Sequence, residues 1–252
     1  MSKYIIGDIH GCFDTFMALV NQLPKDAEII LVGDLIDRGP KSKEVIQYVI
    51  DNNIDCVLGN HEQMWIDEHH KVMDFITHSG LIPRGNRGSL WTVNGGYETL
   101  KSYETILEDE LDDRGLPTRA LEFDIIEEHY EFLKTLPVYL EYPELKTDDG
   151  RHLVVSHSSV NRVWKMRNDD LHKDQFKRTA MWTRDFSRMR SNLEIYNVFG
   201  HTPQEASATV KQIYANIDTG CVFKSVGYGF MTALKFPEME LFTQDNIDEV
   251  TW

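Results

Sequence analysis

Two short stretches place carboxylate, imidazole and guanidinium groups in close succession. Asp8 and His10 stand one residue apart in GDIHG, so on an extended strand end both side chains could point to the same side and share an ion. Asp34, Asp37 and Arg38 lie in GDLIDRG, directly after the apolar run IILV. Asp34 can bridge two cations, and Arg38 can bind a phosphate oxygen with two hydrogen bonds. Taken singly, each stretch also fits a polar turn or a surface ion pair.

The stretch GNHEQ, residues 59–63, is consistent with two roles. Asn60 could be the N-cap of a helix, with Gln63 three residues on completing a capping box. Asn60 and His61 could instead face a reaction, since an amide oxygen bound to a metal can hardly also cap Gln63. His157 in VVSHSS and His201 in VFGHTP each follow an apolar run directly, a position where a lone histidine is more often structural.

The argument for chemistry comes from the set as a whole. Six residues supply oxygen or nitrogen ligands, with no thiolate among them: Asp8, His10, Asp34, Asn60, His157 and His201. This mixture suits two ions such as manganese, iron or zinc, with Asp34 shared between them. Two such ions roughly 3.5–4 Å apart bind a bridging hydroxide and clamp a phosphoryl group for in-line attack. The set therefore predicts phosphoryl hydrolysis.

The elements that must position these residues follow a repeated pattern of an apolar run, a small residue and a polar cluster. Helical spacing lies between the early runs, in residues 16–23 before Pro24 and in residues 45–50. Strand, helix, strand, helix, strand predicts parallel βαβ units. Ligands of open α/β sheets collect beyond the carboxyl ends of the strands, which is where the polar clusters would lie.

Residues from about 62 to 136 differ from the rest in the spacing of their apolar residues, and we expect a mainly helical insertion there. Within it, residues 84–98 are rich in glycine and basic, which favours an ordered loop. Past residue 196, the runs 212–218, 228–236 and 239–242 predict antiparallel strands. The acidic tail 243–252 is expected to be loosely held. We expect one domain over residues 1–252.

Composition excludes several classes of protein. The chain has 252 residues, 41% of them hydrophobic, with a net charge of −15 and a pI of about 5.0. An acidic chain opposes binding to nucleic acid. The sequence contains no run of 18 apolar residues, so we expect no membrane-spanning helix. The strand-like KYIIG begins within three residues of Met1, which leaves no room for a signal peptide. Three cysteines without a C-x-x-C spacing argue against disulfides and favour the cytoplasm. The oligomeric state is not specified.

Other reactive side chains have simpler explanations. Cys12 and Cys221 lie in or beside the motif loops without a histidine partner, so we interpret both as packing residues. His69 and His70, followed by Asp74, could form a second metal site on a helix. Charged helix faces are more often only solvated, and we favour that interpretation here.

The motifs resemble those of a known family, the phosphoprotein phosphatases of the calcineurin-like metallophosphoesterases. GDIHG, GDLIDRG, GNHE, SHS and GHTP occur in the family's order and cover about residues 1–220. The segments GNHEQM, WTVNGG, MWTRD and IDTGCVF are similar to those of the bacterial and phage branch, the bacteriophage lambda type. One departure is Ser158, where the family usually has alanine or glycine after the histidine.

The resemblance implies a fold and a set of metal ligands. The fold would be α/β, a four-layer α/β/β/α sandwich of two mixed sheets with the helical insertion. Asp8 and His10 would hold the first ion, and Asp34 would bridge. The second ion would be held by the remaining ligands, Asn60, His157 and His201. Manganese is the first choice of metal, with iron or zinc as alternatives.

The resemblance also implies roles for residues around the ions. His61 would protonate the leaving oxygen, and Asp37 would fix His61 through a hydrogen bond. The phosphate would be bound by Arg38, Asn60, His61 and Arg184.

The implied activity is dephosphorylation of phosphoserine and phosphothreonine proteins, with phosphotyrosine also within reach, by a hydroxide that bridges two metal ions. The symmetrical dinucleoside tetraphosphatases share these motifs, as do other small-molecule phosphoesterases, and sequence alone separates them poorly. A third alternative is a catalytically inactive binding module on the same fold. The intact ligand set, with His61 and both arginines, argues against that third alternative.

Overall fold

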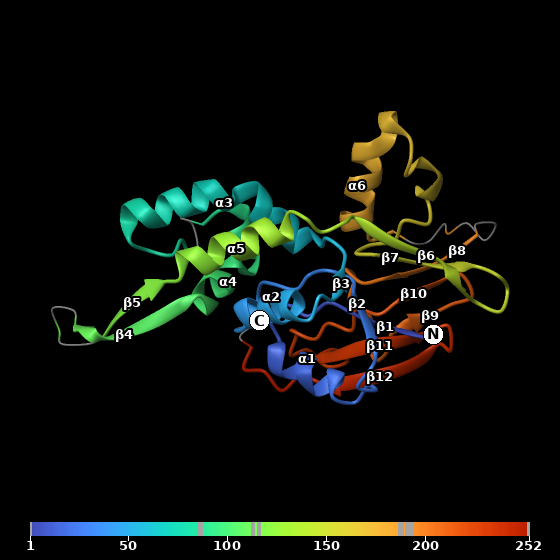
Figure 1. The fold of residues 1–252 in the computed structure, drawn as a ribbon, viewed down its shortest axis with the longest axis horizontal. Coiled ribbons are helices and arrows are strands. Elements are labelled where there is room, and N and C mark those ends of the chain that lie inside the picture. Colours follow the sequence, from blue (N-terminus) through green and yellow to red (C-terminus); the bar gives the residue numbers. More distant parts are fainter. Residues whose placement is uncertain are drawn as a thin grey trace.

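Two mixed five-stranded sheets form the centre of the fold (Figure 1). The computed structural model describes residues 2–84, 88–111, 114, 117–185, 189 and 194–250. In the first sheet, three parallel strands are joined by antiparallel strands at one edge, in the order β12-β11-β1-β2-β3. These strands are β1 (Lys3–Ile6), β2 (Glu28–Leu31), β3 (Asp55–Cys56), β11 (Phe230–Phe236) and β12 (Glu240–Asp245). The predicted parallel units β1-α1-β2 and β2-α2-β3 are thus confirmed, with helices α1 (Phe13–Val20) and α2 (Ser42–Asp51).

The second sheet has three parallel strands flanked by an antiparallel strand on each side, in the order β6-β7-β8-β10-β9. Its strands are β6 (Tyr139–Lys146), β7 (His152–Ser156), β8 (Ile195–Phe199), β9 (Thr209–Val210) and β10 (Tyr214–Asn216). Helix α6 (Lys173–Trp182) and two short 3-10 turns, Trp164–Met166 and Asp170–His172, precede β8.

Alternation along the strands explains why the sheets pack in layers. Ile5 of β1 faces the second sheet, in a buried cluster with Val155 and Val198, whereas its neighbours Tyr4 and Ile6 face helices α1 and α2. In β7, Leu153 and Val155 face the first sheet, and Val154 packs toward Phe176 and Ala180 of α6. Since successive strand side chains point to opposite faces, each sheet buries both. The predicted four-layer α/β/β/α sandwich is therefore confirmed.

The segment from about 62 to 136 holds helices and also a hairpin that the helical pattern did not predict. Its elements are α3 (Asn60–Ser79), a π-helical turn (Thr92–Gly96), α4 (Tyr97–Ser102), β4 (Glu104–Leu111), β5 (Pro117–Leu121) and α5 (Phe123–Leu133). Helices α3 and α5 lie side by side in Figure 1, and the hairpin extends away from both sheets. On α5 the predicted apolar face is buried at Ile126, Tyr130 and Leu133, while Phe123 is exposed.

Three predictions about local structure were wrong. The expected loop at residues 84–98 is helical from Leu90 onward, with residues 85–87 outside the described part. Gly95 lies within this helical stretch with a φ of 120°, a value that glycine adopts without strain. Strand β10, in the run 212–218, pairs parallel with β8 and antiparallel only with β9.

The third correction concerns the acidic tail, which is anchored up to Val250. The Asp248 carboxylate accepts hydrogen bonds from the backbone N–H groups of Asp14 and Thr15, at 3.2 and 2.9 Å. Val250 is buried in the core between the first sheet and its helices. These contacts satisfy backbone N–H groups in the first turn of α1. The acidic composition of the tail did not predict that it would be anchored in this way. Residues 251–252 lie outside the described part of the chain.

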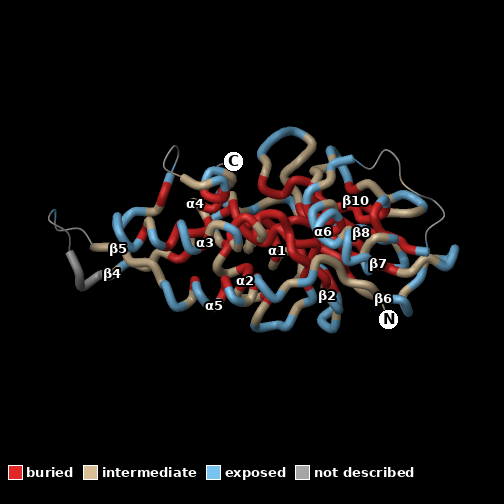
Figure 2. Tube along the Cα trace, turned by 90° about the horizontal axis from the view of Figure 1, so that it is seen from above, coloured by how far each residue is buried: buried red, intermediate tan, exposed pale blue. Residues whose placement is uncertain are grey.

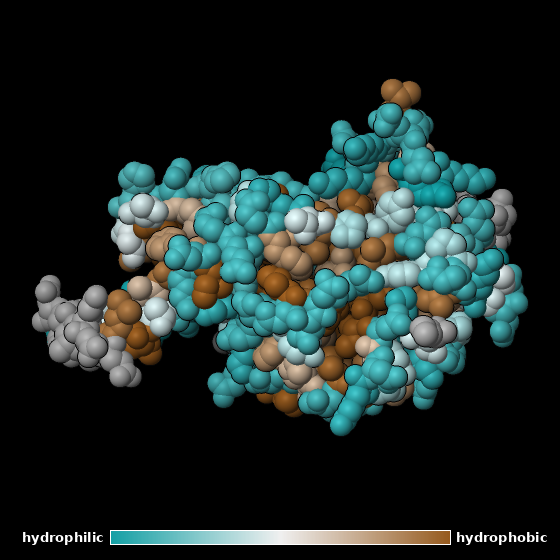
Figure 3. Space-filling model, viewed as in Figure 1, coloured by the Kyte–Doolittle hydropathy of each residue, from teal (hydrophilic) through white to brown (hydrophobic). Residues whose placement is uncertain are grey.

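Burial and surface character agree with this layering. Buried segments gather where sheets and helices meet (Figure 2). Hydrophilic residues cover most of the face seen in Figure 3, as the net charge of −15 leads one to expect. Among the described residues, none of the helices combines the length and the apolar character needed to cross a bilayer.

Candidate functional site

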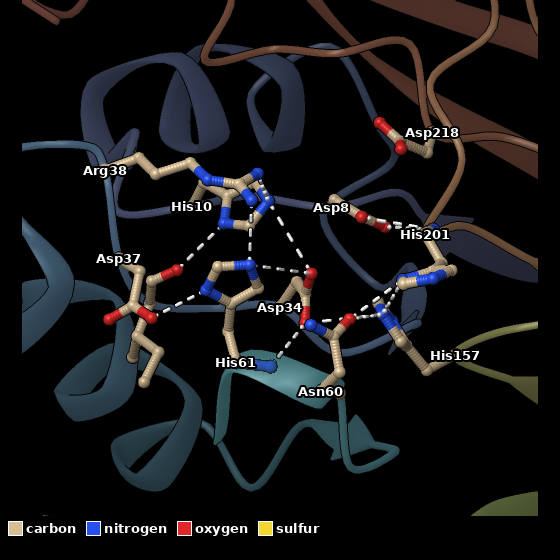
Figure 4. A network of polar contacts seen from close by, with 12 residues as sticks. Asp8, His10, Asp34, Asp37, Arg38, Asn60, His61, His157, His201 and Asp218 are labelled. Carbon is tan, nitrogen blue, oxygen red and sulfur yellow. Dashed lines mark hydrogen bonds and ion pairs between the residues drawn. The ribbon is translucent and has the colours of Figure 1, made fainter. Parts of the chain in front are cut away.

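The predicted site residues converge at the carboxyl ends of strands from both sheets. They follow β1 (Asp8, His10), β2 (Asp34, Asp37, Arg38), β3 (Asn60, His61), β7 (His157) and β8 (His201). A cavity of about 330 Å³ opens among most of them and also reaches Arg184 and Asp218. Parallel strands place their carboxyl ends at one edge, and stacking two sheets brings two such edges together. Figure 4 shows the resulting network.

The backbone at the site is held in an unusual conformation. His10, Asp34, Asp37, Arg38 and His201 all have φ between 50° and 74°. Residues other than glycine adopt this left-handed region rarely and at a cost of about 1–3 kcal/mol each. The surrounding loops therefore maintain strain at the residues that carry the chemistry.

The GNHEQ stretch begins helix α3, but the capping box is not the one expected. Gly59 is the N-cap, and the Glu62 carboxylate accepts the Gly59 N–H at 2.9 Å. Glu62 also accepts the backbone N–H groups of Asp34 and Leu35, at 2.9 and 2.8 Å. Gln63 bonds Asp67 instead of a backbone group. Asn60 is thereby released from capping, and its side chain faces the site (Figure 4).

The Asp34 carboxylate lies between two groups of nitrogen donors. Its Oδ1 is 3.3 Å from Nε2 of His157, and its Oδ2 is 3.6 Å from Nε2 of His10 and 3.9 Å from Nε2 of His61. Both groups, His10-Asp34-His61 and Asp34-His157-His201, are buried and compact enough to hold an ion. Burial would raise the pKa of Asp34, yet the facing histidines outweigh it and keep that pKa well below its usual range. A shared, ionised Asp34 is what a bridging ligand requires.

Lone pairs converge at the second group. His157 Nδ1–H donates to the carbonyl of Val32 at 2.9 Å, so the lone pair of the neutral ring is on Nε2. That Nε2 faces Oδ1 of Asn60 at 2.9 Å and Oδ1 of Asp34 at 3.3 Å. Burial lowers the pKa of His157, so the ring favours its neutral form. Nδ1 of His201 also lies 2.8 Å from Oδ1 of Asn60, so oxygen and nitrogen donor atoms from four residues converge here, an arrangement that suits a cation.

The charges of the carboxylates around Asp34 lead to the same conclusion. Burial, together with Asp218 and Asp34, raises the pKa of Asp8 well above its usual value, and burial raises the pKa of Asp218 to about 7. The crowded carboxylates would be stabilised by added positive charge. Nε2 of His201 is buried and has no hydrogen-bond partner among the described residues. The donor set therefore fits two divalent ions with oxygen and nitrogen ligands.

His61 is held by Asp37 beside the donor groups. Nδ1 of His61 lies 2.6 Å from Oδ2 of Asp37, and both side chains are buried. Burial alone would lower the pKa of His61, but the Asp34 charge and the Asp37 hydrogen bond outweigh it, and the pKa is raised. An imidazole oriented in this way and biased toward its protonated form can act as a general acid.

The segment 62–136 holds Asp37 in place. Oδ1 of Asp37 accepts hydrogen bonds from the indole N–H of Trp91 at 3.0 Å and from the hydroxyl of Thr99 at 2.6 Å. The backbone N–H of Asp37 donates to the hydroxyl oxygens of Thr99 and Ser42, at 2.9 and 3.1 Å. The role of this segment, open at the level of sequence, thus includes fixing the carboxylate that orients His61.

The two arginines border the cavity from different sides. The guanidinium of Arg38 lies 2.8 Å from Nε2 of His10 and 2.9 Å from Nε2 of His61, so its positive charge faces both rings. Arg184 is exposed, lines the cavity and lies two residues beyond the end of α6. Ser158 stabilises that chain end, because its hydroxyl donates to the carbonyl of Thr183 and its N–H to the carbonyl of Ala180.

Sequence reasoning missed four residues at or next to the site: Glu62, Trp91, Thr99 and Asp218. Asp218 follows β10 in ANIDTG, which has the same pattern of strand and polar cluster as the other motifs, so a signal for it existed. Glu62 stands within GNHEQ itself. Trp91 stands in WTVNGG, which was singled out only as a family-like segment, and Thr99 carries no local signal. Both reach Asp37 only because the segment 90–102 packs against α2 and the loop after β2.

The remaining reactive groups behave as packing residues. Cys12, Cys56 and Cys221 are free and buried, and burial raises the pKa of Cys56. His69 is buried against the ring of Tyr130, accepts the indole N–H of Trp65 at 3.0 Å and bonds Glu127 at 2.8 Å. These contacts give His69 a structural role, so the expectation of a solvated helix face was wrong for this residue.

The sequence is similar to curated proteins along nearly its whole length. The asymmetrical bis(5'-nucleosyl)-tetraphosphatase PrpE of Anoxybacillus flavithermus is 30% identical over 262 residues, covering 94% of this chain and 91% of that protein. PrpE of Bacillus cereus is 28% identical over 264 residues, covering 94% and 92%. The symmetrical enzyme of Buchnera aphidicola is 51% identical over 67 residues, only 25% of this chain and 24% of that protein.

Solved structures share the fold. A protein described as a candidate diadenosine tetraphosphatase superposes with a TM-score of 0.58 at 18% identity, covering 98% of this chain and 95% of that one. A protein serine/threonine phosphatase from Saccharomyces cerevisiae gives 0.52 at 13% identity, covering 99% and 81%. The expected membership of the lambda-type protein phosphatase branch is not confirmed. Residues 1–205 match the profile of the calcineurin-like phosphoesterases, and the chain belongs to this metallophosphoesterase family.

Proposed function

We propose that this chain is a metal-dependent hydrolase of dinucleoside polyphosphates, acting on a tetraphosphate bridge. The observation that carries the phosphoryl chemistry is the shared Asp34 between two donor groups, with His61 and Arg38 beside it. The substrate class is supported by the relatives, since those similar over more than 90% of both chains are named as bis(5'-nucleosyl)-tetraphosphatases. Their names favour asymmetrical cleavage, whereas support for the symmetrical alternative comes from a 67-residue match.

Each group at the site has a proposed task. Asp8 and His10 would hold one divalent ion, and Asn60, His157 and His201 the other, with Asp34 shared. Such ions supply Lewis-acid chemistry, which activates water near neutral pH and offsets phosphoryl charge. We propose manganese as the metal, with iron or zinc as alternatives.

Other residues of the chain would bind the phosphate oxygens and protonate the leaving oxygen. Arg38 and Arg184 would bind phosphate oxygens, Arg38 at the end nearer His61 and Arg184 at the end nearer His201. His61 would donate its Nε2 proton to the leaving oxygen, and Asp37 would hold the opposite ring nitrogen in its protonated form. Three buried free cysteines support a reducing compartment such as the cytoplasm.

Dephosphorylation of phosphoserine and phosphothreonine proteins is the second candidate. It is supported by the segments GNHEQM, WTVNGG and MWTRD that resemble protein phosphatases. The two candidates share the metal site and the general acid, so they differ only in what binds around the scissile phosphate.

A competition between substrate classes tests the proposal. The manganese-loaded protein would be assayed with diadenosine tetraphosphate and with phosphoserine, phosphothreonine and phosphotyrosine peptides under identical conditions. We expect the highest kcat/KM for the dinucleotide, with ATP and AMP as products by chromatography. Two ADP molecules would indicate symmetrical cleavage, and a strong preference for the peptides would overturn the proposal. Asp34→Asn serves as the control for contaminating activity.

A further inference from the structure

An aromatic side chain lies at the edge of the polar cavity, and the phosphoryl chemistry has no use for it. Trp182 ends helix α6, lines the cavity and is 42% exposed. Its ring stands edge-on to His201, with ring centroids 6.3 Å apart and an interplanar angle of 79°. The ring is therefore next to a proposed metal ligand and open to solvent.

Packing does not explain the exposure of Trp182. The neighbouring α6 residues Phe176 and Ala180 are buried against the second sheet, and Met181 is buried as well, as the amphipathic pattern of the helix requires. The other described tryptophans, Trp65, Trp91 and Trp164, are at most 1% exposed. Exposing a large aromatic side chain forfeits the hydrophobic stabilisation that burial would provide. An exposed indole on the wall of a polar cavity points to a ligand.

The chain around Trp182 aligns it with a phosphate-binding group. After Trp182 the backbone becomes extended at Thr183 (φ −75°, ψ 132°), and Trp182 and Arg184 both line the cavity. The carbonyl of Thr183 accepts the Ser158 hydroxyl, which ties this corner to the loop that carries His157. A flat apolar ring and a guanidinium two residues apart thus face the same cavity. Together they match the base and the phosphate of a nucleotide.

The opposite end of the cavity differs. Phe223 also lines it, but the guanidinium of Arg38 lies 5.6 Å from its ring centroid, and Tyr228 packs edge-on against it at 6.3 Å. That ring face is already covered by a cation. Trp182 is therefore the better candidate for contact with a second planar group.

We propose that Trp182 is a stacking platform for a nucleobase of the substrate, with Arg184 binding the phosphate next to it. The inference rests on the proposed function, since only a nucleotide substrate presents a base beside its phosphates. Stacking of a base on an aromatic side chain tolerates any base, because every base has a π-face. The indole would thereby select for nucleotides over phosphopeptides without reading base identity.

Binding measurements test the platform without turnover. Wild type, Trp182→Ala and Trp182→Phe would be titrated calorimetrically with β,γ-methylene ATP and with methylenediphosphonate, which carries the β,γ-methylene unit without a nucleoside. Trp182→Ala should weaken the binding of the nucleotide analogue about tenfold relative to that of the diphosphonate, and Trp182→Phe should retain most of the affinity. Leu171→Ala, which removes a 91% exposed apolar side chain just before α6, is the matched control and should not change the ratio. Equal weakening of both ligands, or none, would overturn the inference.

Kinetics separate this inference from the proposed function. For diadenosine tetraphosphate relative to p-nitrophenyl phosphate, the ratio of kcat/KM should fall about tenfold in Trp182→Ala. A protein that does not hydrolyse the dinucleotide would contradict the proposed function. If the nucleotide analogue still lost about tenfold in affinity with Trp182→Ala, the platform would stand on its own. An unchanged kinetic ratio together with unchanged analogue binding would reject the platform while leaving the proposed function intact.

Discussion

His61 Nδ1 and Asp37 Oδ2 are 2.6 Å apart in a buried contact that fixes which nitrogen of the imidazole faces the cavity. Asp37 is fixed in turn by Trp91 and Thr99, residues that stand 54 and 62 positions away in the chain. The geometry of the His61-Asp37 pair therefore depends on contacts of long sequence separation.

The first prediction concerns the leaving group. His61→Asn should lower kcat for an alkyl phosphate such as phosphoserine by about 10²–10⁴-fold, because an alkoxide needs a proton in order to leave. p-Nitrophenyl phosphate should lose much less, since its phenolate leaves readily. Asp37→Asn, which removes the orienting acceptor, should show the same inequality to a smaller extent. Steady-state kinetics on both esters measure it, and equal losses would exclude His61 as the general acid.

The second prediction separates a positioning role from a structural one. Trp65 and Trp91 are stacked and buried, with ring centroids 5.1 Å apart, and each donates one indole hydrogen bond. Trp65→Phe and Trp91→Phe should each lower the free energy of unfolding by about 1–3 kcal/mol, because the first leaves Nδ1 of His69 without its donor and the second removes one of two hydrogen bonds to Oδ1 of Asp37.

Only Trp91→Phe should also lower kcat, since its lost bond is to Asp37 rather than to His69. Urea denaturation and kinetics are compared on the same preparations. Equal kcat values for the two variants would remove Trp91 from the positioning of His61.

The third prediction concerns the metal ions. Wild type should bind about two manganese ions per chain, as paired hydrolytic sites do. Asp34→Asn should lose most of both, because it contributes to each donor group, whereas His201→Ala should keep about one. Equilibrium dialysis with elemental analysis measures the stoichiometry, and circular dichroism checks the fold. Two ions retained by Asp34→Asn would contradict the shared role.

The fourth prediction tests the departure at Ser158. Ser158→Ala removes the hydrogen bond to Thr183, and a typical net loss of about 0.5–1.5 kcal/mol corresponds to a 2- to 10-fold rise in KM through misplacement of Arg184. Adding Ser158→Ala to Arg184→Ala should produce no further rise. The exposed Ser207→Ala is the control. Additive effects in the double mutant would show that Ser158 acts independently of Arg184.

The fifth prediction concerns stability and pH away from the site. His129 is buried between Tyr103 and Gln47, and burial together with Lys43 lowers its pKa to about 4. Below pH 6.5 the unfolded chain takes up a proton that folded His129 does not. The part of the free energy of unfolding that depends on His129 is therefore complete above pH 6.5 and is lost as the pH falls toward 4.

The loss should approach about 3 kcal/mol by pH 4. His129→Gln should flatten this part of the plot of unfolding free energy against pH. Urea titrations at several pH values give the slopes. A slope in His129→Gln equal to that of wild type would contradict the prediction.

The residue pattern was sufficient to predict which side chains lie at the strand ends and which chemistry those side chains allow. Local pattern suffices for this, because an apolar run followed by a polar cluster places Asp8, Asp34 or His157 at a carboxyl edge whatever lies elsewhere. The parallel units around β1 and β2 were predicted from the same spacing. The two mixed sheets were predicted from the family resemblance.

Tertiary structure alone decided the contacts that support these residues. Glu62 caps its own helix and bonds the backbone of Asp34, a contact between positions 28 apart that released Asn60 toward the cavity. Trp91 and Thr99 reach Asp37, and Asp248 closes the start of α1, only because packing brings distant segments together. Hydrogen bonds of this kind leave no periodic trace in the sequence, since they depend on where two elements meet rather than on which element each forms.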